Sequence, residues 1–268
     1  MAEFCKVERE GHVWVVTINR PEVMNSLHPP ANRELAAVWD EFEADPEAWV
    51  GIITGAGERA FSAGNDLKYQ AMGGDMRGQP ASGFAGLTSR FGLSKPLIAA
   101  VNGVAMGGGF EIALACDLII ASENALFALP EPRVGLAALA GGLQRLPRMI
   151  PLKQAMGMIL TGRRVGALEG KQLGFVTDVA KHDALLATAR GWAEQILECS
   201  PLSIRASKQT ALQSLAIPDL QDAMRNSLYP AIADMERRIA VEIADAFEHA
   251  LTSANPTEDD LYRHVYAD

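Results

Sequence analysis

The ten residues NGVAMGGGFE, at positions 102–111, run from the end of an apolar strand through three consecutive glycines into an apolar helical segment. Glycine lets the backbone approach a ligand closely, and the N–H groups in the first turn of a helix have no partner within the helix. The stretch therefore predicts a strand, a tight turn and a helix whose first amides can bind an oxyanion.

Glu111 ends that stretch and is the only carboxylate between residues 104 and 116. Burying an uncompensated carboxylate among apolar side chains is costly. Glu111 therefore either faces a cavity or accepts hydrogen bonds from the first turn of its own helix, where negative charge is favourable. The residues by themselves leave both alternatives open.

Short apolar strands are expected before and after residues 102–111, and they alternate with helical segments. A β-branched run, VWVVTI, fills positions 13–18 and stops at a turn. Further strands are expected at positions 50–55, 96–102 and 118–121, and a helix with one apolar face at 32–44. Such a pattern predicts an α/β fold with a mostly parallel sheet covered by helices.

From about residue 183 onward the strand patterns end and helical patterns take over, interrupted by Pro201, Pro218 and Pro230. We therefore expect a main domain at residues 1–200 and a helical domain at 201–268. The apolar stripe within residues 239–251 predicts packing on the main domain or on a neighbouring subunit.

The overall composition excludes some classes of partner. The chain has 268 residues and a formal net charge of −9, which disfavours nucleic acid because polyanion binding needs clustered Lys and Arg. No signal-peptide pattern and no run of about 18 apolar residues is visible, so we expect a cytoplasmic protein with no membrane partner. Cys5, Cys116 and Cys199 are widely spaced and have no flanking His, so no metal site is expected.

Two further segments contain possible functional residues. Residues 55–60, GAGERA, follow a strand and match a dinucleotide-binding turn, but turn-forming residues continue where that motif needs a helix, so a surface turn is the better interpretation. Glu131 lies between Pro130 and Pro132, which restrict the backbone on both sides. Glu131 is either a directed functional side chain or part of an ordinary surface turn.

Taken together, residues 58–68 (ERAFSAGNDLK), 95–117 and 127–146 resemble the signature segments of the crotonase, or enoyl-CoA hydratase, family, in the family's order and spacing. The resemblance extends from the strand at Val13 to about Ser207. It implies a crotonase-like spiral of ββα units, with a C-terminal helical domain used in trimerisation. The expected assembly is a homotrimer or a hexamer.

The resemblance also implies roles for individual residues. The N–H groups of Asn65 and Gly108 would polarise the carbonyl of an acyl-CoA thioester, and Glu111 and Glu131 would hold a water between them. By resemblance Glu131 protonates C2 and Glu111 activates the water, although the sequence leaves this division open. No cofactor is implied, because coenzyme A is part of the substrate. The residues expected to contact coenzyme A are Val23, Met24, Ala63, Asp66, Leu67 and Lys68.

These features predict a hydro-lyase that adds water to, or removes it from, an acyl-CoA. Residues 83–88, 107–114 and 127–131 look like those of carnitinyl-CoA dehydratases, which makes crotonobetainyl-CoA a candidate substrate. The chain departs from that group at Asn65, where Trp is usual, and at Ala138 and Leu139, where the turn is usually polar. The alternatives are an isomerase or another lyase on the same fold, and a non-catalytic binding protein.

Overall fold

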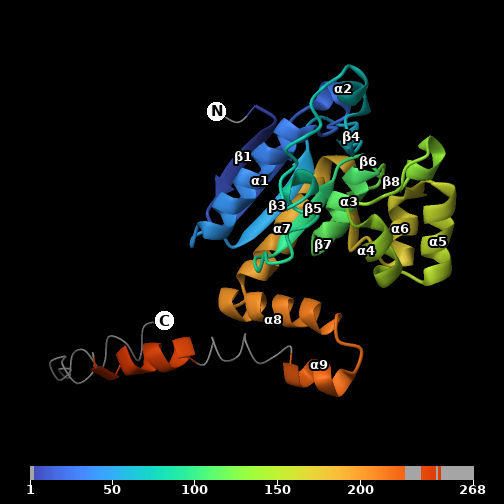
Figure 1. The fold of residues 1–268 in the computed structure, drawn as a ribbon. Helices are drawn as coiled ribbons and strands as arrows, with labels where there is room; N and C mark the ends of the chain where they lie inside the picture. Colours follow the sequence, from blue (N-terminus) through green and yellow to red (C-terminus); the bar gives the residue numbers. More distant parts are fainter. Residues whose placement is uncertain (1–2, 227–236, 246, 249–268) are drawn as a thin grey trace. The chain divides into compact units, whose positions relative to one another are not determined.

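The computed structural model describes residues 3–226, 237–245 and 247–248 (Figure 1). The chain forms two compact units, residues 1–205 and 206–268, and each is described by itself. The second unit contains the whole of α9 (Leu220–Asn226) and all but the first five residues of α8 (Pro201–Ser214). A domain boundary at residue 200 and a role of the second unit in trimerisation stay predictions. The predicted stripe at residues 239–251 lies partly outside the described residues.

The first unit is built on a six-stranded sheet in the order β1-β2-β3-β5-β7-β10. Only β1 pairs antiparallel, with β2, and all other neighbours are parallel. This confirms the predicted α/β fold with a mostly parallel sheet. The strands are β1 (Cys5–Glu10), β2 (Val13–Ile18), β3 (Val50–Gly55), β5 (Leu97–Val101), β7 (Leu118–Ser122) and β10 (Asp178–Ala180).

Helices cover both faces of this sheet because the strands are apolar on both faces. Along β2, Trp14 and Val16 pack in one core cluster with the buried face of α1 (Pro29–Ala44). The alternate residues Val13 and Val15 pack in a second cluster with α7 (Leu185–Leu197). Successive side chains of a strand point to opposite faces, so one strand joins two cores.

A second, four-stranded sheet has the order β4-β6-β8-β9. Its strands are β4 (Ala60–Ser62), β6 (Val104–Met106), β8 (Leu126–Ala128) and β9 (Val165–Gly166). Each of β3, β5 and β7 in the large sheet is followed in the chain by a strand of the small sheet. The chain therefore winds as a spiral that passes alternately through the two sheets. The strands β4, β6 and β8 run parallel to one another. Their carboxyl ends therefore lie at one edge of the small sheet.

The helix α1 begins earlier than the sequence pattern predicts, at Pro29 rather than at residue 32. The His28 ring accepts a hydrogen bond from Ala31 N–H and caps the helix. Proline is tolerated in a first helical turn because the N–H that it lacks would have no partner there. The remaining helices of the first unit are η1 (Pro21–Val23), α2 (Leu67–Ala71), η2 (Phe84–Gly86), α3 (Gly108–Ala115), η3 (Glu131–Val134), α4 (Gly142–Met149), α5 (Leu152–Thr161), α6 (Ala167–Leu173) and η4 (His182–Ala184).

Candidate active site

The site predicted from the sequence lies where β4, β6 and β8 end. The chain leaves β4 into Gly64 and Asn65, leaves β6 into Gly107 and Gly108, and leaves β8 toward Glu131, which begins η3. Because these three strands are neighbours and parallel, the topology of the small sheet brings the three segments to one edge.

Backbone segments around Asn65 and Gly108 are in direct contact. A Cβ atom on Gly64 would lie 2.7 Å from Met106 O and 2.8 Å from Gly108 N, and the φ of Gly64 is +87°. Both the close approach and the left-handed backbone require glycine. Gly64 therefore lets the amide of the next residue, Asn65, come near the amide of Gly108.

Both of these amides are available to a ligand. The bonds from Leu27 N–H to Gly64 O and from Asp66 N–H to Leu27 O flank Asn65 in a parallel bridge, so the Asn65 N–H points away from that bridge. Gly108 is the first residue of α3, where N–H groups have no intrahelical partner. Neither N–H donates to another group within the part of the chain that the structure describes.

Glu111 is deeply buried on α3, with only 3% of its surface exposed. Its Oε1 accepts a hydrogen bond from Gly142 N–H at the start of α4, with an N···O distance of 2.8 Å. This bond goes to α4, and the Glu111 carboxylate accepts none from the first turn of α3 among the described residues, so Glu111 does not cap its own helix. Burial raises the pKa of Glu111 to about 7; the Gly142 N–H opposes this rise and the charge of Glu131 adds to it.

Glu131 approaches the same place from η3. Its Oε2 is buried and has no hydrogen-bond partner among the residues that the structure describes. Its Oε1 would lie 2.6 Å from a Cβ atom on Gly107, so the carboxyl group lies directly against the turn before α3. Burial raises the pKa of Glu131 as well. The structure thus brings the two glutamates within electrostatic reach of each other, each with a raised proton affinity.

Arg145 is a charged neighbour of this pair that the sequence did not single out. It lies on α4, one turn after Gly142, and its Nη2 donates to Thr88 O with a distance of 2.9 Å. Burial lowers the pKa of Arg145, and its charge lowers the pKa of Glu111. The only sequence signal was its place in the predicted helix after the second glycine pair.

The residues predicted to contact coenzyme A gather near the proposed oxyanion-binding amides. Val23 and Met24 are half-buried in the turn after β2, and Ala63 N–H donates to Met24 O with a distance of 2.9 Å. Leu67 and Lys68 are exposed at the start of α2. The geometry is compatible with one binding surface for these residues, and their contacts with coenzyme A stay predictions.

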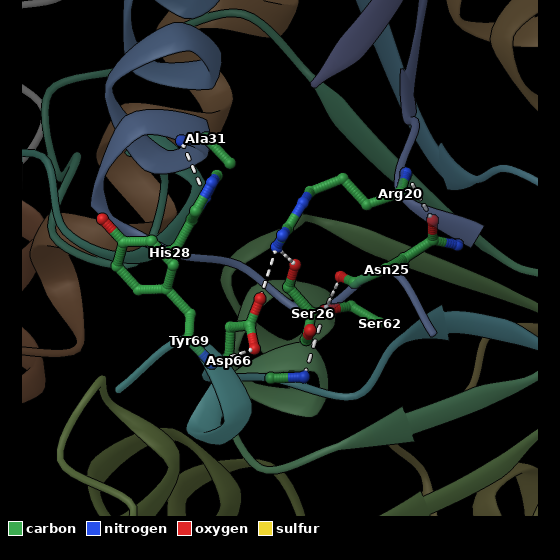
Figure 2. A network of polar contacts seen from close by, with 9 residues as sticks. Arg20, Asn25, Ser26, His28, Ala31, Ser62, Asp66 and Tyr69 are labelled. Carbon is green, nitrogen blue, oxygen red and sulfur yellow. Dashed lines mark hydrogen bonds and ion pairs between the residues drawn. The ribbon is translucent and has the colours of Figure 1, made fainter. Parts of the chain in front are cut away.

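Asp66 is different because its carboxylate is buried and engaged within the protein (Figure 2). Its Oδ2 pairs with Arg20 Nη1 at 2.9 Å, and its Oδ1 accepts from Tyr69 N–H, which caps α2. Any contact of Asp66 with coenzyme A would therefore involve its backbone. The ion pair with Arg20 was not predicted, because the two residues are 46 positions apart in the sequence.

Within residues 3–226, 237–245 and 247–248, no group of three His, Cys, Asp or Glu side chains is placed to hold a metal ion. In the same residues no helix is long and apolar enough to cross a bilayer.

Comparisons with known proteins point to one family. The family model described as enoyl-CoA hydratase/isomerase matches residues 8–235. A carnitinyl-CoA dehydratase of Escherichia coli K12 is 41% identical over 92% of this chain and 96% of its own length. An (E)-benzylidenesuccinyl-CoA hydratase of Thauera aromatica is 43% identical over 79% of this chain and 83% of its own. The crystal structure of an enoyl-CoA hydratase from Mycobacterium marinum superposes with a TM-score of 0.81 at 38% identity, covering 92% of this chain and 96% of that one.

Proposed function

This chain belongs to the enoyl-CoA hydratase/isomerase family, and we propose that it is a hydro-lyase that reversibly adds water across the C2=C3 double bond of an enoyl-CoA thioester. The curated relatives described above are named hydratase and dehydratase, so addition and removal of water is the chemistry shared by their names.

The observation that carries the proposal is a pair of glutamates beside two free backbone amides: Glu111 is buried, and Glu131 is half-buried with its Oε2 out of contact with solvent. Glu111 and Glu131 both have a raised pKa, and the charge of one raises the pKa of the other. Two such carboxyl groups favour sharing one proton, so one can accept a proton while the other donates one. An acid and a base held together in this way are what hydration requires.

In the proposed mechanism, the amides of Asn65 and Gly108 donate hydrogen bonds to the thioester oxygen and stabilise the negative charge that develops there. Losing one such donor typically slows a reaction about 10²- to 10³-fold. Glu111 accepts a proton from water as the water oxygen bonds to C3. Glu131 gives its proton to C2, which ends the reaction with one molecule of water added.

The identity of the acyl group is the finer part of the proposal. Crotonobetainyl-CoA is a candidate because of the carnitinyl-CoA dehydratases among the relatives. An aryl-substituted enoyl-CoA is a candidate because of the Thauera aromatica relative. We further propose that the enzyme is a cytoplasmic homotrimer or hexamer assembled through its C-terminal helices, which sedimentation of the full chain would test.

The function is tested by following loss of the conjugated enoyl thioester absorbance with crotonyl-CoA, longer enoyl-CoAs, cinnamoyl-CoA and crotonobetainyl-CoA. Wild type is expected to consume at least one of them and to form a 3-hydroxyacyl-CoA of the mass expected for one added water. An enzyme that only moves the double bond would give a product of unchanged mass. That result, or no turnover of any substrate, would remove the hydratase proposal.

We expect kcat/KM for hydration to fall as the pH drops below about 7. The pKa of Glu111 is raised to about 7, and a general base must be deprotonated to accept the proton of water. Protonation of Glu111 at lower pH therefore removes the base. The measurement is the pH profile of kcat/KM, with unfolding followed at each pH as a control. In Glu111→Gln the decline near pH 7 should be absent from the residual rate, and a wild-type profile that is flat across this region would contradict the assignment.

A further inference from the structure

The loop that holds Asn65 is attached to the rest of the protein mainly through one segment. Ala63 N–H donates to Met24 O, Leu27 N–H donates to Gly64 O, and Asp66 N–H donates to Leu27 O. All three bonds join the loop to residues 24–27. The position of the Asn65 amide therefore depends on how that segment is held.

Arg20 contacts both the loop of residues 63–66 and the supporting segment of residues 24–27 (Figure 2). Its Nη1 donates to Ser26 O, within the supporting segment. The same nitrogen pairs with Asp66 Oδ2 at 2.9 Å, on the residue next to Asn65. The side chain of Arg20 is 12% exposed and that of Asp66 is 5% exposed, so solvent screens the pair little.

The surroundings of the pair favour its charged form. Burial by itself would raise the pKa of Asp66, but the Tyr69 N–H and the Arg20 guanidinium lower it below its usual value. His28 lies beside them, with its ring packed edge-on against the rings of Phe4 and Tyr69. Burial and the charge of Arg20 lower the pKa of His28, which favours a neutral ring, although Asp66 and Glu3 act in the opposite direction. The carboxylate of Asp66 is thus the ion-pair partner of Arg20.

We propose that Arg20 is a positioning residue for the reaction: through Asp66 and Ser26 it fixes the loop of residues 63–66 so that the Asn65 amide stays aimed at the thioester oxygen beside Gly108. This inference rests on the proposed function, because it assumes that the two amides bind that oxygen. The guanidinium touches neither the substrate nor the reacting atoms, and it acts through the backbone that it holds. A planar guanidinium can donate hydrogen bonds to a carbonyl and to a carboxylate at the same time. The ammonium group of Lys does so with poorer geometry.

The test compares Arg20→Met, Arg20→Lys and Asp66→Asn with wild type. Asp66→Asn removes the charge but keeps an oxygen that can accept from Tyr69 N–H, so α2 retains its cap. We expect kcat to fall roughly 10- to 100-fold in Arg20→Met and Asp66→Asn, less than the loss of a whole oxyanion donor, and less again in Arg20→Lys. KM should change only a few-fold. The matched control is Arg190→Lys on α7, which alters the ion pair of Arg190 with Glu10 at the end of β1, outside the site.

A spectroscopic measurement separates positioning from a general loss of structure. Butyryl-CoA labelled with ¹³C at the thioester carbonyl has no double bond to hydrate, so its carbonyl stretching band can be recorded when bound. Hydrogen bonds from the two amides should lower the frequency in wild type and in Arg190→Lys, and this shift should be smaller in Arg20→Met at saturating ligand. An unchanged shift and an unchanged kcat in folded Arg20→Met would overturn the proposal, as would losses that only follow the unfolded fraction. If wild type hydrates no enoyl-CoA, the proposed function fails, yet the carbonyl band still decides the role of Arg20.

Discussion

Glu131→Gln is expected to slow hydration of the best enoyl-CoA substrate about 10²- to 10⁴-fold, the usual contribution of a positioned acid or base. The amide has nearly the shape of the carboxyl group but cannot deliver an acidic proton to C2. Glu131 Oε2 has no partner among the described residues, and the amide oxygen of Gln can still accept from the residue's own backbone N–H as the carboxyl group does, so the substitution costs the fold little. The loss should therefore appear in kcat, with the melting temperature unchanged or raised.

Glu111→Gln is expected to give a loss of similar size, because the amide cannot accept the proton of water. Its oxygen can still accept from Gly142 N–H, as the carboxylate does. The double variant should be scarcely slower than either single variant, since an acid and a base that act on one water are not additive. Glu123→Gln, on an exposed glutamate, is the matched control. Activity within a few-fold of wild type in either single variant would refute the proposed roles.

Gly107→Ala is expected to abolish most activity and to destabilise the protein at the same time. Gly107 has a φ of +53° and a ψ of −124°, a conformation that costs a residue with a side chain about 1–3 kcal/mol. The added Cβ would also lie 2.6 Å from Glu131 Oε1, so the carboxyl group or the turn must move. Either movement shifts the proton donor or the Gly108 amide. We expect a kcat loss of about 10²-fold or more, as for loss of an oxyanion donor, measured beside thermal unfolding.

The control for this substitution is Gly157→Ala, in the middle of α5. A Cβ at Gly157 meets nothing within 4 Å, and its φ is not in the left-handed region. Alanine is the better helix former by about 1 kcal/mol, so this variant should be fully active and slightly more stable. Normal kcat in Gly107→Ala would mean that the turn before α3 does not position the reacting groups.

The strands of the large sheet were predicted where burial on both faces leaves an unbroken apolar run, as in β2 and β3. The edge strand β1 was not predicted, because its sequence CKVERE alternates charged residues with few apolar ones and pairs on one side only. The strands β9 and β10 have two and three residues, too few to show a period. The three-residue strands β4, β6 and β8 of the small sheet were not predicted either, although β4 is fully buried. Local pattern therefore identified the buried strands of five or six residues in the large sheet and missed the edge strand and the shorter ones.

In the candidate site, too, local features could be predicted and contacts between distant segments could not. The glycine turn before α3 and the directed backbone at Glu131 were visible in the sequence because each is a local feature. The partner of Glu111 is the amide of Gly142, 31 residues later, and nothing local indicates that contact. Asp66 was predicted as a coenzyme A contact, and the sequence gave no sign that its carboxylate would be bound by Arg20.

By itself, the sequence determined the longer buried strands of the large sheet, the glycine turns and the places of the carboxyl groups, because these depend on side-chain period and backbone freedom over a few residues. Only the tertiary structure decided that the ends of β4, β6 and β8 meet. It also raised the proton affinity of two glutamates 20 positions apart. The physical reason is that strand order, burial and electrostatic reach depend on packing between distant segments, and those contacts exist only once the chain has folded.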